Sequence, residues 1–386
     1  MNRIKDWIYD MIRLLAVTGK RPKPGHPRAL LVRVDEIGDF MLWHSFIVPV
    51  LQAAEFRQFE WHFCGNKSWK TLFDQFYPGV LQETCWMDKM AFKKKMGYRY
   101  RFLREIYRKN FALVINPTYS RDKRYDDSIV MAAKAAKNIG MQANSECLRP
   151  YEAGYDAGLY QSVFALPEKP VFEWLRNRAF AEFLTGENLA IQRVLIGEDR
   201  IPPRLAGLPE NYCVIFPGSR SAARIWPAEN FAAIGSFVSK TFGWAIVVAG
   251  APADRYYADD FGRHYGSPVI DLCGKTTLPE TLALLRHARC MVSVDTGSIH
   301  LAAAVGCPVY GIFNGSQYGR FSPYPAELAP DFHAFYPDEI APLLADAAIV
   351  RERFEFVVDI PYELVSADKI IQAIRSGFRG SPHLDE

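Results

Sequence analysis

Short apolar runs typical of buried parallel strands alternate with helix-length segments in both halves of the chain, and this alternation constrains the fold most strongly. In the first half the expected strands span residues 29–34, 59–65 and 112–116, and a helix is expected over 173–184. In the second half the expected strands span 212–216, 244–249, 290–294 and 309–313, with helices over 277–288 and 299–305. The pattern predicts an α/β protein with two doubly wound, Rossmann-like parallel sheets that face a central cleft.

The length of 386 residues agrees with two domains, because a single hydrophobic core rarely serves more than about 300 residues. We expect a basic leader over 1–28, a first domain over 29–205, a second domain over 206–350 and a helical tail over 351–386. The composition, 49% hydrophobic and 23% charged, excludes a disordered chain. The formal net charge of +3 argues against a nucleic-acid partner held by overall charge.

The cysteine pattern and the hydropathy bear on the cellular compartment in which we expect the protein. The 7 cysteines are scattered and form no Cys-x-x-Cys pair, which argues against a disulfide framework and against a zinc site. No apolar run is long enough to span a membrane, and Asp6 and Asp10 interrupt any secretory signal. We therefore expect a cytoplasmic protein, with peripheral attachment to the inner membrane as an open possibility.

The leader contains an amphipathic helical pattern followed by basic residues. One face carries the apolar side chains Ile4, Trp7, Ile8, Met11, Ile12 and Leu15, and Lys20, Arg21, Lys23 and Arg28 follow it. A helix on an anionic membrane surface fits this pattern. A helix docked on its own domain, or on a second subunit, fits it equally well.

A second basic segment runs from Lys89 to Lys109, with nine basic residues and a single acid, Glu105. Aromatic residues alternate with the cations, so the segment can form a binding surface for an anionic ligand. Single-stranded nucleic acid also suits such a surface, but the nearly neutral chain makes it the minor interpretation. We take Lys93, Lys94, Lys95, Arg99 and, further along the chain, Arg121 as candidate residues for binding an anionic ligand. A solvated helix face without a ligand is an equally good interpretation, because charge runs usually are solvated.

Ligands of open parallel sheets bind at the carboxyl ends of the strands. The first strand ends in Asp35-Glu36-Ile37-Gly38-Asp39, a strand-to-helix turn. There, the Asp39 carboxylate can act as a general base towards a hydroxyl. Taken alone, Asp39 is better explained as a first-turn acid that stabilises the helix dipole.

Three strand-end loops of the second half carry the groups that an anionic diphosphate needs. The loop over 217–226, PGSRSAARIW, offers Ser219, Ser221 and Arg224. The segment over 295–300, DTGSIH, runs into a helix N-terminus, where free N–H groups attract anions, and supplies Asp295, Thr296, Gly297, Ser298 and His300. Asp254 follows another strand, where an acid can hold a ribose hydroxyl pair or cap a helix.

The order of these motifs resembles one family. RVDEIGD over 33–39 is similar to the N-terminal signature of glycosyltransferase family nine, the ADP-heptose:lipopolysaccharide heptosyltransferases. PGSRSAARIWP is similar to that family's phosphate loop, and VVAGAPAD, DLCGKTTLPE and SVDTGSIHLAAAVGCPVYGIF follow in the family's order. The resemblance spans about residues 29–324 and is more specific in the second half.

The resemblance implies a GT-B fold, with the acceptor in the first domain and a nucleotide-sugar donor, ADP-heptose, in the second. It therefore makes Lys93, Lys94, Lys95, Arg99 and Arg121 candidate acceptor-binding residues, for an anionic glycolipid or glycan. By resemblance Asp39 matches the family's catalytic base, Arg224 the basic residue on the donor diphosphate and Asp254 the acid on the ribose. Thr296, Gly297 and His300 match the loop around diphosphate and sugar. The implied activity is inverting transfer of a sugar, heptose, to a hydroxyl of a lipopolysaccharide-core or related glycan.

The sequence contains no Asp-x-Asp, the motif with which many glycosyltransferases hold a metal, so we expect a metal-independent reaction that requires no cofactor. Arg224 and the helix N-terminus over 297–300 then take the place of the metal. Two alternatives of other classes remain at this stage. They are a nucleotide-sugar epimerase with the same fold and a non-catalytic module that binds nucleotide or carbohydrate.

Overall fold

The computed structural model describes residues 2–81, 83–165, 171–191 and 193–378. The chain divides into two compact units. The N-terminal unit comprises Met1–Pro167 and Leu175–Ala190, and the C-terminal unit comprises Glu168–Trp174 and Ile191–Glu386.

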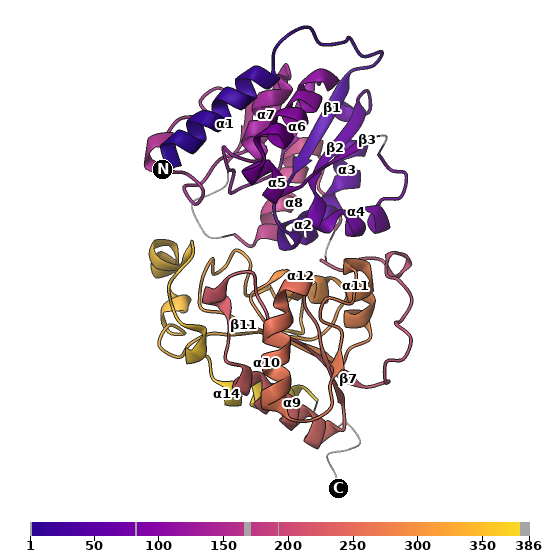
Figure 1. The fold of residues 1–386 in the computed structure, drawn as a ribbon, viewed down its shortest axis with the longest axis vertical. Helices are drawn as coiled ribbons and strands as arrows, with labels where there is room; N and C mark the ends of the chain where they lie inside the picture. The colour runs from indigo at the N-terminus through magenta and orange to yellow at the C-terminus, as the bar shows by residue number, and fades with distance from the viewer. Residues whose placement is uncertain (1, 82, 166–170, 192, 379–386) are drawn as a thin grey trace. The chain divides into compact units, whose positions relative to one another are not determined.

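The N-terminal unit is built on a parallel six-stranded sheet in the order β3-β2-β1-β4-β5-β6. Its strands are β1 (Arg28–Arg33), β2 (Glu60–Asn66), β3 (Glu83–Met87), β4 (Leu113–Asn116), β5 (Lys137–Met141) and β6 (Ser162–Phe164). Its helices are α1 (Asn2–Ala16), α2 (Ile37–Trp43), α3 (Ile47–Gln52), α4 (Lys70–Phe76), α5 (Lys89–Lys94), α6 (Met96–Lys109), α7 (Asp126–Ala133) and α8 (Glu173–Thr185). Figure 1 shows α1, α6 and α7 side by side on the sheet.

The apolar stretch after Asp39 is divided into α2, a short 3-10 turn and α3. Pro49 explains where the chain restarts. Its ring carries no N–H, and it lies in the first turn of α3, where N–H groups lack an intrahelical partner in any case. The interruption leaves α2 as a short helix with Asp39 in its first turn.

The C-terminal unit repeats the architecture with a parallel six-stranded sheet in the order β12-β11-β10-β7-β8-β9. Its strands are β7 (Tyr212–Phe216), β8 (Ala245–Val248), β9 (Ile270–Asp271), β10 (Cys290–Val294), β11 (Val309–Ile312) and β12 (Phe332–Phe335). Its helices are α9 (Ala228–Phe242), α10 (Arg255–Tyr265), α11 (Leu278–Arg286), α12 (Gly297–Ala304), α13 (Ala347–Ile349) and α14 (Ala367–Gly377). Thr277 caps α11, because its hydroxyl accepts from the Glu280 N–H at 3.3 Å.

Both sheets begin with a central strand, extend to one edge and then cross to the other side. Neighbours β1 and β4, and likewise β7 and β10, are therefore the pairs at which the winding reverses. The expected α/β class with two Rossmann-like, doubly wound sheets is confirmed. In such sheets the crevice outside the carboxyl ends of these two central strands is where ligands bind.

Helix α1 docks on its own unit, against α6 and α7, which is one of the two interpretations of the leader. The face that docks is not the apolar one. Asp6, Tyr9 and Ala16 are buried, whereas Ile4 and Trp7 are about two-thirds exposed. In the part of the chain that the structure describes, no helix combines the length and apolarity needed to cross a bilayer.

Candidate functional site

Asp39 lies at the carboxyl end of β1, in the first turn of α2, and is half-buried. Its Oδ2 accepts a hydrogen bond from the backbone N–H of Glu36 at 3.2 Å. This bond agrees with the interpretation of Asp39 as an acid in the first turn of a helix. The same position places a carboxylate at the reversal point of the sheet, where a ligand is expected.

Arg33, the last residue of β1, holds the turn that carries Asp39. Its guanidinium is fully buried, and its Nε lies 2.9 Å from a carboxylate oxygen of Asp35. Its two Nη atoms donate to the backbone oxygens of Pro117, at 2.8 Å, and Asp39, at 3.1 Å. One side chain thus connects the loops after β1 and β4. The sequence motif contained Arg33, but nothing in the local pattern indicated that it would be buried.

Lys89 is the cation next to the same turn. Its Nζ lies 2.9 Å from Glu36 Oε1. Burial by itself lowers the pKa of Lys89, but the carboxylates of Glu36, Asp35 and Asp39 outweigh burial, so the pKa is raised. Sequence reasoning counted Lys89 only as part of a basic segment, because the strand β3 that positions it was not expected.

Two of the candidate acceptor residues, Arg99 and Arg121, are buried inside the N-terminal unit. Arg99 is buried, and its guanidinium lies over the rings of Tyr9 and Phe92 at 4.1 and 4.2 Å. Arg121 is buried between Asp127, at 2.8 Å, and Asp156, at 2.6 Å. Because both side chains are buried, neither belongs to the acceptor surface that we propose.

The three consecutive lysines are placed differently. Lys93 and Lys94 end α5, Lys95 precedes α6, and all three side chains are exposed. Among the described residues, no carboxylate lies within ion-pair distance of any of them. They are therefore available to an anionic ligand.

In the C-terminal unit, the loops after three neighbouring strands meet. Gly218, in the loop after β7, lies so close to Asp254, after β8, that an added Cβ would stand 2.5 Å from the Asp254 Cβ. Arg224 Nη1 lies 3.2 Å from the Oδ2 of Asp295, which follows β10, and 3.2 Å from its backbone oxygen. The sequence-predicted residues Arg224, Asp254 and Asp295 are thus gathered at one edge of the sheet.

A chain of hydroxyl groups lines the start of α12. Thr296 Oγ1 and Ser298 Oγ are 2.6 Å apart, and Ser298 Oγ is 3.1 Å from Ser293 Oγ. Gly297 is the first residue of α12. The free N–H groups at this end of the helix, together with the helix dipole, favour the binding of an anion. Burial raises the pKa of the adjacent Asp295 carboxyl, and the Arg224 guanidinium counteracts that rise.

His300 is buried in the first turns of α12, with Nδ1 2.6 Å from the hydroxyl of Tyr324. Burial lowers the pKa of His300 to about 3 and raises that of Tyr324 well above its ordinary value. At neutral pH the ring is therefore uncharged, and Tyr324 keeps its phenolic proton. His300 orients the loop as a neutral group and carries no positive charge towards a diphosphate.

The remaining predicted residues are less enclosed. Asp254 is half-buried, and its Oδ2 accepts from the Ala251 N–H at 2.8 Å, so the capping interpretation describes its contact. Ser219 is buried and its hydroxyl accepts from the N–H of Ser221, whose side chain is exposed. The described residues contain no group of three or more His, Cys, Asp or Glu side chains that could hold a metal ion.

Comparison with known proteins points to one family. Residues 179–329 match the family model of glycosyltransferase family 9 (heptosyltransferase). Lipopolysaccharide heptosyltransferase 3 of Escherichia coli is 30% identical over 122 residues, which are 31% of this chain and 36% of that protein. Lipooligosaccharide heptosyltransferase 2 of Haemophilus influenzae is 28% identical over 112 residues, 28% of this chain and 31% of that protein. The chain thus aligns with about a third of the length of these curated relatives.

Solved structures extend the likeness of the fold to both units. A glycosyltransferase family 9 protein from Veillonella parvula superposes with a TM-score of 0.65 at 16% identity, covering 90% of this chain and 96% of that one. The E. coli heptosyltransferase WaaC, solved with ADP-2-deoxy-2-fluoro heptose, gives a TM-score of 0.64 at 16% identity, covering 91% and 99%. The fold is therefore that of GT-B glycosyltransferases. Residues 179–329 thus match glycosyltransferase family 9 in their motifs and in the family model, and the fold of both units agrees with that likeness.

Proposed function

We propose that the protein is an inverting glycosyltransferase that moves a sugar, heptose, from a nucleotide-sugar donor to a hydroxyl of a lipopolysaccharide-core or related glycan. One observation carries the proposal. The region that matches the family model contains all three loops whose side chains, Arg224, Asp254 and Asp295, gather at the carboxyl edge of the second sheet. An edge of this kind is where a doubly wound sheet binds a nucleotide.

The donor class follows from the chemistry of these loops. A diphosphate is matched by the Arg224 guanidinium and the N-terminus of α12, and a ribose hydroxyl pair by Asp254. WaaC, which has the same fold, was solved with ADP-2-deoxy-2-fluoro heptose. We therefore assign ADP-heptose as the donor and place it on the C-terminal unit, with the acceptor on the N-terminal unit.

In the proposed reaction the Asp39 carboxylate accepts the proton of the acceptor hydroxyl. The acceptor oxygen forms a bond to the anomeric carbon while the bond from that carbon to the diphosphate oxygen breaks. Attack opposite to the leaving group inverts the anomeric configuration. The diphosphate takes the electron pair, and Arg224 with the first N–H groups of α12 stabilises the developing charge without a metal ion.

To accept the proton, the Asp39 carboxylate exchanges one of its present contacts, such as the bond between Oδ2 and the Glu36 N–H, for the acceptor hydroxyl. Arg33 keeps the backbone at Asp39 fixed during this exchange, because it holds the Asp39 carbonyl oxygen from inside the sheet. Lys89 keeps positive charge beside the three acids of the turn, Asp35, Glu36 and Asp39.

The acceptor proposal rests on charge and on the relatives. Lys93, Lys94 and Lys95 offer exposed cations to phosphates or acidic sugars of a glycolipid, and several relatives are named for transfer to lipopolysaccharide or lipooligosaccharide. Such an acceptor places the enzyme in the cytoplasm at the inner-membrane surface.

The test of the function is a transfer assay with ADP-heptose and a truncated lipopolysaccharide core. Release of ADP should require the acceptor. Turnover of the donor without acceptor would favour the epimerase alternative, and ADP binding without any turnover would favour a binding module.

A further inference from the structure

The face of α1 that points away from its unit is almost entirely apolar. Trp7 and Ile4 are 65% and 66% exposed, and Ile8, Met11, Leu14 and Leu15 are exposed as well. At 100° per residue these six side chains share one stripe along the helix. In most surface helices such a stripe packs on the core, so its exposure requires an explanation.

Polar contacts hold the opposite face of α1 to the unit. Asp6 accepts from Arg124 Nε at 2.6 Å and from Arg149 Nη1 at 2.7 Å. Asp10 is paired with Lys123 at 2.8 Å, and the Tyr9 hydroxyl donates to the Lys93 oxygen at 2.7 Å. These bonds fix the rotation of the helix about its axis, and they fix it with the apolar stripe outwards.

The same bonds separate the charges of α1. Both acids of the helix, Asp6 and Asp10, lie towards the unit and are paired there. Arg3 and Lys5 are exposed beside the apolar stripe, and exposed Lys20 and Lys23 follow the helix. The outward side therefore combines large apolar side chains with positive charge.

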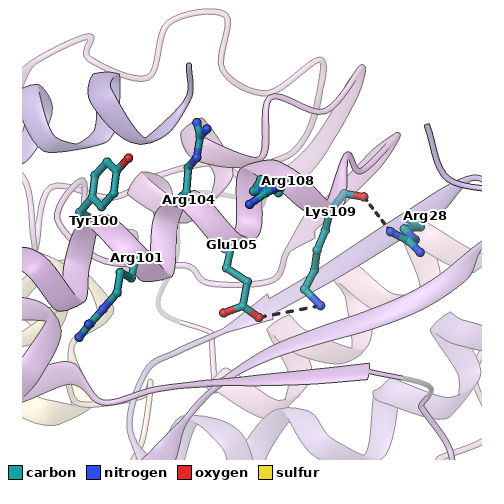
Figure 2. Close-up of a pocket in the computed structure, with 7 residues that line it drawn as sticks. All are labelled: Arg28, Tyr100, Arg101, Arg104, Glu105, Arg108 and Lys109. Carbon is teal, nitrogen blue, oxygen red and sulfur yellow. Dashed lines mark hydrogen bonds and ion pairs between the residues drawn. The ribbon is translucent and has the colours of Figure 1, made fainter. Parts of the chain in front are cut away.

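More cations adjoin α1 on α6. Arg104 Nη1 donates to the Ala16 oxygen at 3.0 Å, so the C-terminal end of α1 lies against α6. A depression of about 410 Å³ on α6 is lined by Arg101, Arg104, Glu105 and Arg108, among others. Figure 2 shows these four side chains projecting from the helix. Glu105 is paired with Lys109, and within the described chain Arg101 and Arg108 have no carboxylate partner.

We propose that this outward face of α1, with its basic neighbours, docks the protein on an anionic phospholipid bilayer. The stripe enters the headgroup region, with Trp7 at the interface, while Arg3 and Lys5 contact lipid phosphates. A second copy of the chain is the less suitable occupant, because it would bring the same exposed cations against one another. This proposal deepens the proposed function, on which it rests for its biological meaning, by naming the surface that meets the membrane of the acceptor.

Flotation with vesicles tests the proposal. One vesicle type contains equal parts of phosphatidylglycerol and phosphatidylcholine, and the other contains phosphatidylcholine alone. We expect the protein to float with the anionic vesicles and much less with the neutral ones, since each cation near an anionic surface contributes roughly fivefold in partitioning. Failure to float with either would overturn the proposal.

Variants locate the face. In the triple variant Ile4→Gln, Trp7→Gln and Met11→Gln, each change should lower binding to the anionic vesicles at least about tenfold. The variant should still fold, because all three side chains are exposed. The double change Val357→Gln and Leu364→Gln is the matched control, because these apolar residues are also exposed but lie in the other unit. We expect this control variant to float normally. Normal flotation of the triple variant would refute the assignment of this face.

Two further measurements separate the rival outcomes. Sedimentation velocity should show the same oligomeric state for the parent and the triple variant. A dimer that only the triple variant loses, together with unchanged flotation, would identify the stripe as a subunit interface and contradict the proposal. Thermal stabilisation by ADP should be equal in the parent and in all variants. If the protein floats as expected but neither binds ADP nor transfers sugar, the result counts against the proposed function and leaves the membrane-docking proposal intact.

Discussion

Arg224 and Asp295 form an ion pair that joins the loops after β7 and β10, with Nη1 of the arginine 3.2 Å from both the Oδ2 and the backbone oxygen of Asp295. The arginine is about one-third exposed, so its guanidinium keeps donors for a ligand while the carboxylate fixes its direction. This pair puts a positive charge beside the N-terminus of α12.

Arg224→Ala should weaken ADP binding. Each charge-assisted hydrogen bond contributes about 1.5–3 kcal/mol, so the loss of one raises the Kd at least about tenfold. Isothermal titration with ADP measures the effect, and Arg220→Ala, in the same loop but outside the ion pair, is the control. An unchanged Kd for Arg224→Ala would remove this residue from the donor site.

Asp39→Asn should reduce kcat by roughly 10²–10⁴-fold, because an amide cannot take the proton of the acceptor hydroxyl. The amide oxygen can still accept from the Glu36 N–H, so the melting temperature should change little. ADP affinity should also be retained, since the proposed donor site lies in the other unit. Near-normal turnover would show that Asp39 only caps α2.

Arg33→Met should destabilise the N-terminal unit by about 3 kcal/mol or more, because it leaves the partners of a buried, hydrogen-bonded arginine without their donor. Urea denaturation measures the loss. Arg33→Lys should recover part of the stability but little of kcat, since an ammonium cannot replace the planar fork that reaches both loops. Full activity in Arg33→Lys would contradict a positioning role.

The acid stability of the C-terminal unit should depend on His300. The folded state keeps this ring neutral because burial lowers its pKa to about 3, whereas an unfolded histidine is protonated below about 6.5. The unfolded state therefore binds more protons, and the contribution of this group is present above pH 6.5 and is lost as the pH falls towards 3, by up to about 1.4 kcal/mol per pH unit.

His300→Gln should lack this part of the pH dependence. Unfolding free energies of the parent and the variant, measured between pH 7 and pH 5, provide the comparison. Parallel curves for the two proteins would mean that His300 is not held neutral in the fold.

The strands that flank both reversal points could be predicted from sequence because they are buried on both faces. The ranges of β7 and β10 agree with expectation, and β1, β4 and β11 differ by about a residue at their ends. The edge strands β3, β6, β9 and β12 were missed, and in β3 and β6 polar residues such as Glu83 and Ser162 interrupt the apolar pattern. The inner strand β5 was also missed, because it begins with the polar residues Lys137 and Asn138.

Roles that depend on distant partners could not be predicted. The stripe on α1 was recognised, but its outward orientation depends on Arg124 and Arg149, which lie far along the chain. Likewise, nothing near Arg99 or Arg121 in sequence distinguishes a buried arginine from a ligand-binding one. The clustering of the candidate donor residues Arg224, Asp254 and Asp295 could be predicted, because short strand-end loops place them at an edge that the topology fixes.

The most direct test of the account is acceptor-dependent transfer in the presence of a chelator. The protein is incubated with ADP-heptose, a truncated lipopolysaccharide core and EDTA, and the product mass and its anomeric configuration are determined. The account predicts a product one heptose heavier, with inverted configuration, formed as fast as without EDTA and nearly abolished in Asp39→Asn. Complete loss of transfer in EDTA, restored by a divalent ion, or a product that retains the donor configuration, would contradict it.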